Sequence, residues 1–327
     1  MSELLDSLWI EKYRPKTLDN LVLPEQYKKD FSKIIEKGSI PNLLFSGPPG
    51  GGKTTLAKVL CSKNGVLFNQ KDNLLMANGS AKKTRSIKFV DEVVEPFLKY
   101  PPSGDKYKIV FIDEADKLTG ESFDSYRGII EKYHVAYGRF IFTCNYLSKI
   151  PDPVQSRFTP YAFSQIPKEF VLAYCKNILE SENIEYNEKD IEFIIGQLYP
   201  DVRKVVNILQ RSSWDQKLKV NKKDVITTEK IITSTIIEII SFIEKKETQH
   251  IGRSVNSLIE ILSANQDLEY RSVYTDLFFN PKIPAPAKII INREANRHQN
   301  CLIPHMHFMG MVFDIIKALM DFIKAKS

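Results

Sequence analysis

The residues from Gly47 to Thr54 combine side chains and backbone freedom that suit the binding of a polyphosphate. They read Gly47-Pro48-Pro49-Gly50-Gly51-Gly52-Lys53-Thr54 and fit the spacing G-x-x-x-x-G-K-[ST]. Glycines allow successive backbone N–H groups to converge on phosphate oxygens, the lysine reaches the β- and γ-phosphates, and the following hydroxyl is a ligand for Mg²⁺. We therefore predict that this loop, together with Thr55, binds a nucleoside triphosphate and that Thr54 contacts the metal.

Two carboxylates, Asp113 and Glu114, follow the apolar run Ile109–Ile112. Because side chains alternate along a strand, the two can diverge at its carboxyl end. We expect Asp113 to support Mg²⁺ and Glu114 to polarise the water that attacks the γ-phosphate. The alternative is a pair of exposed acids without a catalytic role. The next apolar run ends at Asn145, whose amide we expect to orient the same water.

The elements that must position these residues alternate between short apolar runs and helical patterns up to about Phe163. This alternation is typical of an α/β fold in which a parallel sheet has helices on both faces. The predicted strands are Leu43–Ser46, Leu74–Asn78, Ile109–Ile112, Phe140–Thr143 and Tyr161–Phe163. The run from Thr55 to Leu60 has helical spacing, so phosphate would lie at a helix N-terminus.

After Pro167 the apolar residues recur at helical intervals, and strand patterns are almost absent. The predicted helices are Phe170–Leu179, Asp190–Leu198, Val202–Leu209, Ile231–Ile243, Val255–Leu262 and Met306–Ile323. The lysine-rich segment Lys217–Asp224 is typical of a linker. We predict an α/β domain over residues 1–163, a small helical lid over 164–228 and an all-helical collar over 229–327.

The composition excludes several classes of protein. An apolar fraction of 43% in 327 residues fits a globular protein, and no apolar stretch reaches the length of a membrane span. The N-terminal residues, which include Glu3 and Asp6, lack a basic and then apolar signal, so we expect the cytoplasm, that of the host if the protein is viral. The four cysteines lack C-x-x-C spacing, which argues against a disulfide framework and a zinc site. The net charge of +6 permits contact with nucleic acid without requiring it.

Several further segments resemble the AAA+ clamp loaders along the whole chain, and most strongly up to about residue 210. The segments that resemble replication factor C small subunits are Trp9-Ile10-Glu11-Lys12-Tyr13-Arg14-Pro15, Ile130-Glu131-Lys132-Tyr133 through Ser156-Arg157, and Pro200-Asp201-Val202-Arg203-Lys204. Asn296-Arg297-His298-Gln299 leading into Phe308–Leu319 is similar to the large clamp-loader subunit of tailed phages. The sequence departs from the family at Gly51, where threonine is common, and at Phe158, where cysteine is common. Neither position supplies essential chemistry.

The resemblance implies an ATPase site that two subunits share. Lys53, Thr54 and Asp113 would hold ATP and Mg²⁺, Glu114 would activate water and Asn145 would serve as sensor 1. From the lid, Arg203 would touch the γ-phosphate, whereas Arg157 would act in trans on the ATP of the neighbouring subunit. The residues that would line the adenine pocket are Tyr13, Arg14 and Val22. The implied partners are further copies of the chain, a distinct small subunit, a ring-shaped sliding clamp and primer-template DNA.

A basic segment follows the second predicted strand and carries Lys82, Lys83, Arg85 and Lys88. Such a segment at a helix start suits a phosphate backbone, and the corresponding helices of clamp loaders follow duplex DNA. We therefore expect these four residues to contact DNA, and the alternative is a solvated charged face.

Two other functions remain open at this level. One is a related AAA+ motor such as a branch-migration helicase, although no basic winged-helix pattern is evident at the C-terminus. The other is a nucleotide-sensing scaffold without meaningful turnover, against which Glu114 and Arg157 argue. The letters Asp113-Glu114-Ala115-Asp116 also spell the tetrapeptide of a large helicase family, whose other motifs are missing here. His305 and His307 lack a nearby third metal ligand, which favours packing at a helix start.

Overall fold

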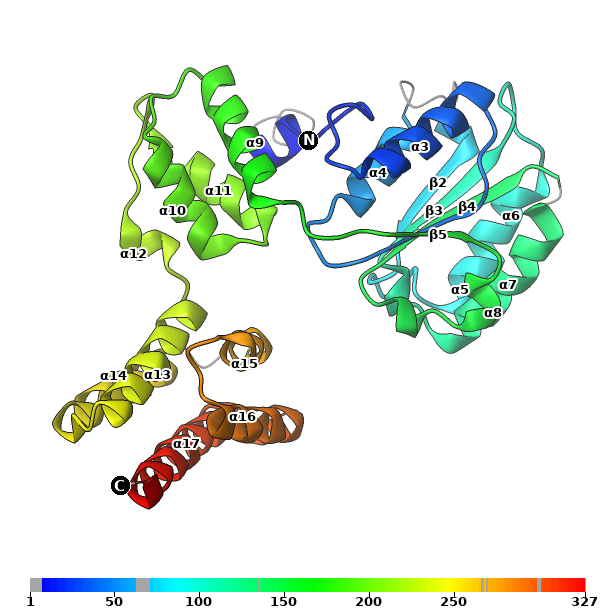
Figure 1. Ribbon diagram of the computed structural model, residues 1–327. Coiled ribbons are helices and arrows are strands. Elements are labelled where there is room, and N and C mark those ends of the chain that lie inside the picture. Colours follow the sequence, from blue (N-terminus) through cyan, green and yellow to red (C-terminus); the bar gives the residue numbers. More distant parts are fainter. Residues whose placement is uncertain are drawn as a thin grey trace. The chain divides into compact units, whose positions relative to one another are not determined.

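The computed structural model describes residues 8–62, 71–134, 136–265, 268, 270–298 and 301–326. Glu3, Asp6 and Gln299 lie outside these described residues. The chain forms two compact units, Met1–Lys219 and Val220–Ser327 (Figure 1). The predicted domain boundaries at residues 163 and 228 stay predictions.

The first unit contains a parallel sheet whose strands lie in the order β2-β3-β4-β1-β5. Their bounds are β1 Leu43–Ser46, β2 Leu74–Asn78, β3 Lys108–Asp113, β4 Gly138–Cys144 and β5 Thr159–Ala162. The five predicted strands are thus confirmed, β1 and β2 to the residue. All four residues of β1 are buried, as expected for a central strand that is covered on both faces.

Helices cover both faces of this sheet, because its strands present apolar side chains to each side in turn. Ile109 and Phe111 pack with Phe31 of α3 (Glu25–Lys37) and Leu56 of α4 (Lys53–Leu60). On the opposite face, Val110 and other apolar residues pack against a second layer of helices. That layer consists of α5 Ile87–Phe89, η3 Val90–Val94, α6 Glu95–Lys99, α7 Gly120–His134 and α8 Asp152–Gln155.

Helices also follow the sheet within the first unit, as the helical spacing predicted. They are α9 Lys168–Ser181, α10 Glu188–Leu198 and α11 Val202–Ser212, and the short N-terminal helix α2 (Trp9–Lys12) contacts α11. The buried indole of Trp9 and a hydrogen bond from its backbone N–H to Gln210 Oε1 (3.0 Å) tie the N-terminal segment to these helices.

The predicted linker Lys217–Asp224 contains the boundary between the two units, at Lys219 and Val220, but most of its residues form regular secondary structure. Strand β7 (Lys217–Leu218) forms a hairpin with β6 (Ser213–Trp214), and helix α12 spans Lys222–Val225. The hairpin turns through Asp215 and Gln216, both at positive φ (56° and 58°). Such turns usually carry Asn-Gly or Asp-Gly, so the sequence lacked the usual signal.

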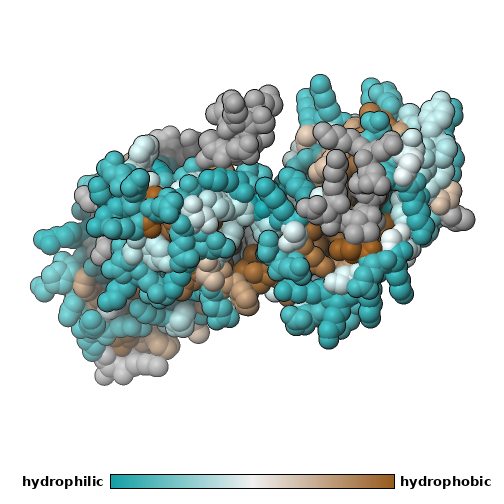
Figure 2. Space-filling model, turned by 90° about the horizontal axis from the view of Figure 1, so that it is seen from above, coloured by the Kyte–Doolittle hydropathy of each residue, from teal (hydrophilic) through white to brown (hydrophobic). Residues whose placement is uncertain are grey.

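The second unit is a bundle of helices around its own apolar core. Its longer helices are α13 Thr228–Glu244, α14 Ile251–Ala264, α15 Tyr270–Phe279, α16 Ala285–His298 and α17 Pro304–Lys326, and the short helices α12 and η6 (Thr248–His250) also lie in this unit. Three of the longer helices were predicted, and α15 and α16 were missed. No helix among the described residues is long and apolar enough to cross a membrane. Hydrophilic side chains cover most of the face shown in Figure 2, with apolar ones in smaller patches.

Candidate functional site

The phosphate loop joins the end of β1 to the start of α4, and glycine is required at two of its positions. A Cβ atom added at Gly47 (φ 140°) would lie 2.2 Å from the carbonyl oxygen of Phe163. Gly52, which precedes α4, has φ 89°, a conformation that L side chains rarely adopt. The first N–H groups of α4 have no partner within the helix, and they carry the positive end of its dipole. The loop therefore offers backbone donors to an anion.

Lys53 is the first residue of α4, and its ammonium group is held inside the loop. Its Nζ donates hydrogen bonds to the carbonyl oxygens of Gly47 (2.7 Å) and Pro48 (2.8 Å) and to Oδ1 of Asn145 (3.1 Å). Burial lowers the pKa of Lys53, while electrostatic interactions with Cys144 and Asp113 act in the opposite direction. Lys53 and the predicted sensor Asn145 thus belong to one hydrogen-bond network of the protein itself.

The carboxyl end of β3 brings the two predicted metal ligands together. Thr54 Oγ1 donates to Oδ1 of Asp113 at 2.8 Å, and the hydroxyl of Thr143 in β4 donates to the same oxygen. Mg²⁺ prefers hard oxygen ligands, and here a hydroxyl and a carboxylate lie side by side beside the phosphate loop. These residues therefore fit the implied magnesium ion.

Glu114 comes directly after β3, and its backbone has the left-handed conformation with φ 53° and ψ 45°. Its N–H donates to Oγ1 of Thr143 at 3.1 Å. A non-glycine residue in this conformation costs about 1–3 kcal/mol and persists only where its surroundings hold it. The turn therefore directs Glu114 away from the strand, and the residue lines the same cavity as Asp113 and Asn145.

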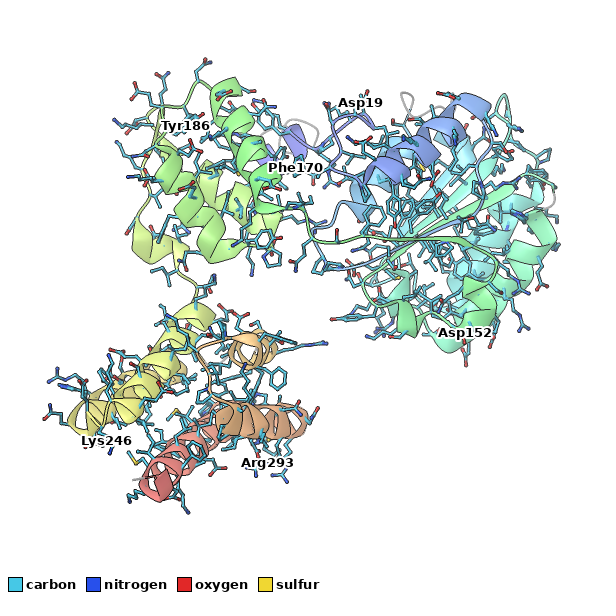
Figure 3. The ribbon with its side chains drawn as sticks, viewed as in Figure 1. Asp19, Asp152, Phe170, Tyr186, Lys246 and Arg293 are labelled. Carbon is cyan, nitrogen blue, oxygen red and sulfur yellow. The ribbon has the colours of Figure 1, made fainter. Side chains whose placement is uncertain are left out.

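A cavity of about 460 Å³ connects the loop, the acidic residues and the following helices. This volume lies in the usual range for small-molecule sites. The predicted residues that line it are Pro49, Gly50, Gly51, Gly52, Lys53, Thr54, Thr55, Asp113, Glu114, Asn145, Arg14, Val22 and Arg203. Apolar side chains form another part of the wall, among them Ile10, Leu21, Tyr174 and Phe170, which Figure 3 labels on α9.

Three predicted residues lie beside the cavity without lining it. Gly47 and Pro48 contribute through the carbonyl groups that bind Lys53. Tyr13 instead joins the N-terminal segment to α9. The Tyr13 hydroxyl donates to Oε1 of Glu182, just beyond the C-terminal end of α9 (2.8 Å), and the Tyr13 carbonyl oxygen accepts from Tyr174 Oη within α9 (3.1 Å). Lys12 also pairs with Glu182 at 2.7 Å. Tyr13 thus has a contact that helps to hold the wall of the cavity.

Arg203 lies in the first turn of α11 and is exposed toward the cavity. Asp201 caps this helix by accepting a hydrogen bond from the N–H of Lys204 at 3.1 Å. Within the described residues Arg203 has no ion-pair partner, so its guanidinium group is available to an anion.

Arg157 lies elsewhere, beyond α8, whose first residue Asp152 is labelled in Figure 3. It does not line the cavity. Its guanidinium group pairs with Glu131 of α7 and donates to the carbonyl oxygen of Pro153. The arginine is therefore separated from the site that its own chain builds.

The basic residues Lys82, Lys83, Arg85 and Lys88 are all exposed and form no ion pairs with described residues. Their backbone is nevertheless fixed, because the carbonyl oxygen of Arg85 accepts from Ser122 Oγ (2.8 Å) and from the N–H of Thr119 (3.2 Å). This segment thus presents free positive charge from a fixed backbone.

Several residues that shape the site escaped prediction from the sequence. Thr143 was predicted only as the last residue of a strand, Glu131 only as part of a segment that resembles clamp loaders, and Glu182 carried no prediction. Asp116 belongs to the tetrapeptide Asp113-Glu114-Ala115-Asp116, which predicts no role for it here. Their roles depend on which strands and helices are neighbours, and no local pattern carries that information.

Comparisons with known proteins agree with this geometry. Residues 43–165 match the model of the ATPase family associated with various cellular activities (AAA). The chain is 36% identical to a replication factor C small subunit of Aeropyrum pernix over 222 residues, which are 68% of this chain and 67% of that protein. It is 39% identical to the one of Methanococcus maripaludis over 206 residues, 63% and 64% of the two chains. The chain thus aligns with about two thirds of the length of these relatives.

Among solved structures, the fold is similar to that of the RuvB Holliday junction branch migration motor of Thermotoga maritima. The TM-score is 0.55 and the identity 19%, with 86% of this chain and 98% of that chain covered. At this identity the likeness concerns the fold alone. It agrees with the parallel five-stranded core followed by helices.

Proposed function

The chain belongs to the replication factor C small-subunit family of AAA+ ATPases, and on this basis we propose that it is an ATP-dependent subunit of a sliding-clamp loader. It would open a ring-shaped clamp and place it on primer-template DNA, and hydrolysis of ATP would release the loader. The likeness to tailed-phage subunits remains a prediction.

One observation carries this proposal: the cavity holds every predicted catalytic group except Arg157. Lys53 and Thr54 begin α4, Asp113 ends β3, Glu114 and Asn145 directly follow β3 and β4, and Arg203 comes from α11. Arg157 lies outside the cavity and pairs with Glu131. A positive charge supplied by a neighbour accelerates phosphoryl transfer by about 10³ to 10⁵. A site that lacks this charge would therefore turn over slowly until subunits assemble.

Within this site each residue has a distinct task. Lys53 and the N–H groups of the loop would bind the β- and γ-phosphates, and Arg203 would bind the γ-phosphate from the helical side. Glu114 would accept a proton from the attacking water, which Asn145 would hold in place. Mg²⁺, held by Thr54 and Asp113, would neutralise charge on the phosphates. Arg14 and Val22 would contact the base.

The proposal gives the other parts of the chain roles in assembly and DNA binding. The exposed residues Lys82, Lys83, Arg85 and Lys88 suit a sequence-independent contact with a phosphate backbone. The second unit exposes large apolar side chains, among them Phe279, Ile289 and Met306, which are 75%, 72% and 64% exposed. Such side chains are suited to contacts with other subunits, so we assign oligomerisation to this unit.

The test is the rate of ATP hydrolysis by the assembled complex with and without its clamp and primed DNA. We expect turnover to rise when both are present, because DNA would align the subunits and bring Arg157 to the neighbouring site. A complex that assembles but shows the same rate with and without them would contradict the proposal.

The sequence also left open a related AAA+ motor and a nucleotide-sensing scaffold, and experiments can distinguish both from a clamp loader. Strand displacement without any clamp would favour that motor. A scaffold without turnover would be favoured instead if Glu114→Gln and the wild type hydrolysed ATP at equal rates.

A further inference from the structure

Asp116 is a buried carboxylate that does not itself line the cavity. It lies in the short helix η4 (Ala115–Lys117), directly after Glu114, and is 6% exposed. Its Oδ1 accepts a hydrogen bond from the backbone N–H of Asn145 at 3.2 Å. Its Oδ2 has no hydrogen-bond partner among the described residues. Because an incompletely satisfied buried carboxylate is costly, its presence beside the ATPase site needs an explanation.

The bond from Asn145 to Asp116 joins the two turns that carry the catalytic side chains. Strands β3 and β4 are neighbours in the sheet (Figure 1), and Glu114 follows one while Asn145 follows the other. Only one residue separates Glu114 from Asp116, so a carboxylate held by Asn145 also restrains the backbone of Glu114. The restraint matters because Glu114 has a left-handed conformation that must be held by its surroundings.

Two further contacts hold Glu114 in the same place. Thr143 accepts from the N–H of Glu114 at 3.1 Å, and Gly79 donates its N–H to the carbonyl oxygen of Asp113 at 2.7 Å. A Cβ atom at Gly79 would lie 2.7 Å from the carbonyl oxygen of Glu114. The turn is thus held from β2 and from β4, and Asp116 supplies the contact that also includes Asn145.

We propose that Asp116 is a positioning residue of the ATPase site, which sets Glu114 and Asn145 relative to each other from inside the protein. This inference rests on the proposed ATPase function. Asp116 itself touches neither nucleotide nor water. Loss of the Asp116 carboxylate leaves the phosphate loop intact, so ATP still binds. Glu114 and Asn145, which act on the attacking water, are then no longer held in a fixed position relative to each other.

The experiment compares Asp116→Ala and Asp116→Asn with the wild type in the assembled complex. A hydrogen bond to a charged group contributes about 1.5–3 kcal/mol, which corresponds to about a 10- to 100-fold change in rate. We expect Asp116→Ala to lower kcat by about this factor and to change the affinity for ATP by less than about threefold. Asp116→Asn keeps an oxygen acceptor, so its kcat should lie between those of the other two proteins. Asp124→Ala removes an exposed carboxylate of α7 and should leave kcat unchanged.

A second readout does not depend on activity. Hydrogen exchange at the amide of Asn145, measured without nucleotide, should be faster in Asp116→Ala than in the wild type and close to wild type in Asp116→Asn. Unchanged kcat in both variants, or a loss of ATP affinity as large as the loss of kcat, would overturn the proposal. If Asp116→Ala does not fold, Asp116→Asn decides: a kcat equal to that of the wild type would overturn it. A wild-type complex that does not hydrolyse ATP would refute the proposed function instead, and the exchange at Asn145 would still test the contact.

Discussion

Replacing Arg157 with alanine should lower the rate of ATP hydrolysis strongly while leaving the free energy of unfolding nearly unchanged. In the folded chain the guanidinium group pairs with Glu131, and the two side chains are 28% and 55% exposed. Ion pairs of this exposure contribute about 0–1 kcal/mol, so Arg157→Ala should lower the free energy of unfolding by no more than that. An arginine that acts on a transferred phosphoryl group contributes about 10³ to 10⁵ in rate, or about 4–7 kcal/mol. Turnover should therefore fall far more than stability.

The assay measures three quantities on Arg157→Ala: ATP affinity of the isolated chain, denaturant unfolding, and kcat of the assembled complex. Affinity should stay within about twofold of the wild type, because Arg157 lies outside its own cavity. Arg211→Ala, which removes an exposed arginine of α11, is the control and should leave all three unchanged. A loss of affinity in the isolated chain, or a complex with normal kcat, would refute the assignment of Arg157 to a neighbouring site.

Three further predictions concern the surroundings of the site. Gly79→Ala places a Cβ atom 2.7 Å from the carbonyl oxygen of Glu114. In denaturant unfolding this variant should lose about 1–3 kcal/mol of the free energy of unfolding. Gly128→Ala is the control and should not destabilise the protein, because a Cβ atom at this helical position meets no atom within 4 Å. Burial acts to raise the pKa of Glu182, but hydrogen bonds from Lys12 and Tyr13 hold this pKa below its ordinary value. The ionised carboxylate therefore stabilises the folded chain above about pH 4.3, the ordinary pKa of glutamate. This contribution is lost as the pH falls through the pKa of Glu182 in the folded state. The free energy of unfolding of Glu182→Gln should therefore vary less with acid pH than that of the wild type, and the difference should be less than about 1 kcal/mol. Identical pH profiles for the two proteins would count against the contact of Glu182 with Lys12 and Tyr13. Replacing both Lys82 and Lys83 with alanine should reduce the slope of log affinity for primed DNA against log salt by about 2, and an unchanged slope would place the DNA elsewhere.

Much of the sheet could be predicted because its strands are buried on both faces. Runs such as Leu43–Ser46 and Ile109–Ile112 are short and apolar, and the phosphate loop follows the first while two carboxylates follow the second. Because parallel strands end at the same edge, the loop, Asp113 and Asn145 could be placed together before the structure was known. Their common cavity agrees with that reasoning.

The remaining parts of the site depend on tertiary neighbours. The hydroxyl of Thr143 binds Asp113 because β4 lies beside β3, and the carboxylate of Asp116 binds the N–H of Asn145 for the same reason. Neither residue type signals such a bond in the sequence. The contact of Tyr13 with Glu182 spans 169 residues, so no local pattern predicts it. The hairpin at Asp215 and Gln216 was missed because its turn residues are unusual.

Mixing two inactive variants tests most directly whether Arg157 of one subunit completes the ATP site of another. Lys53→Ala removes the loop lysine and keeps Arg157, whereas Arg157→Ala keeps the ATP site and removes the arginine. The ATPase rate is measured for each variant alone and for mixed complexes, with clamp and primed DNA present. We expect that the mixture hydrolyses ATP although each variant alone does not, because intact sites then meet intact arginines. Mixed complexes that assemble and remain inactive would contradict it.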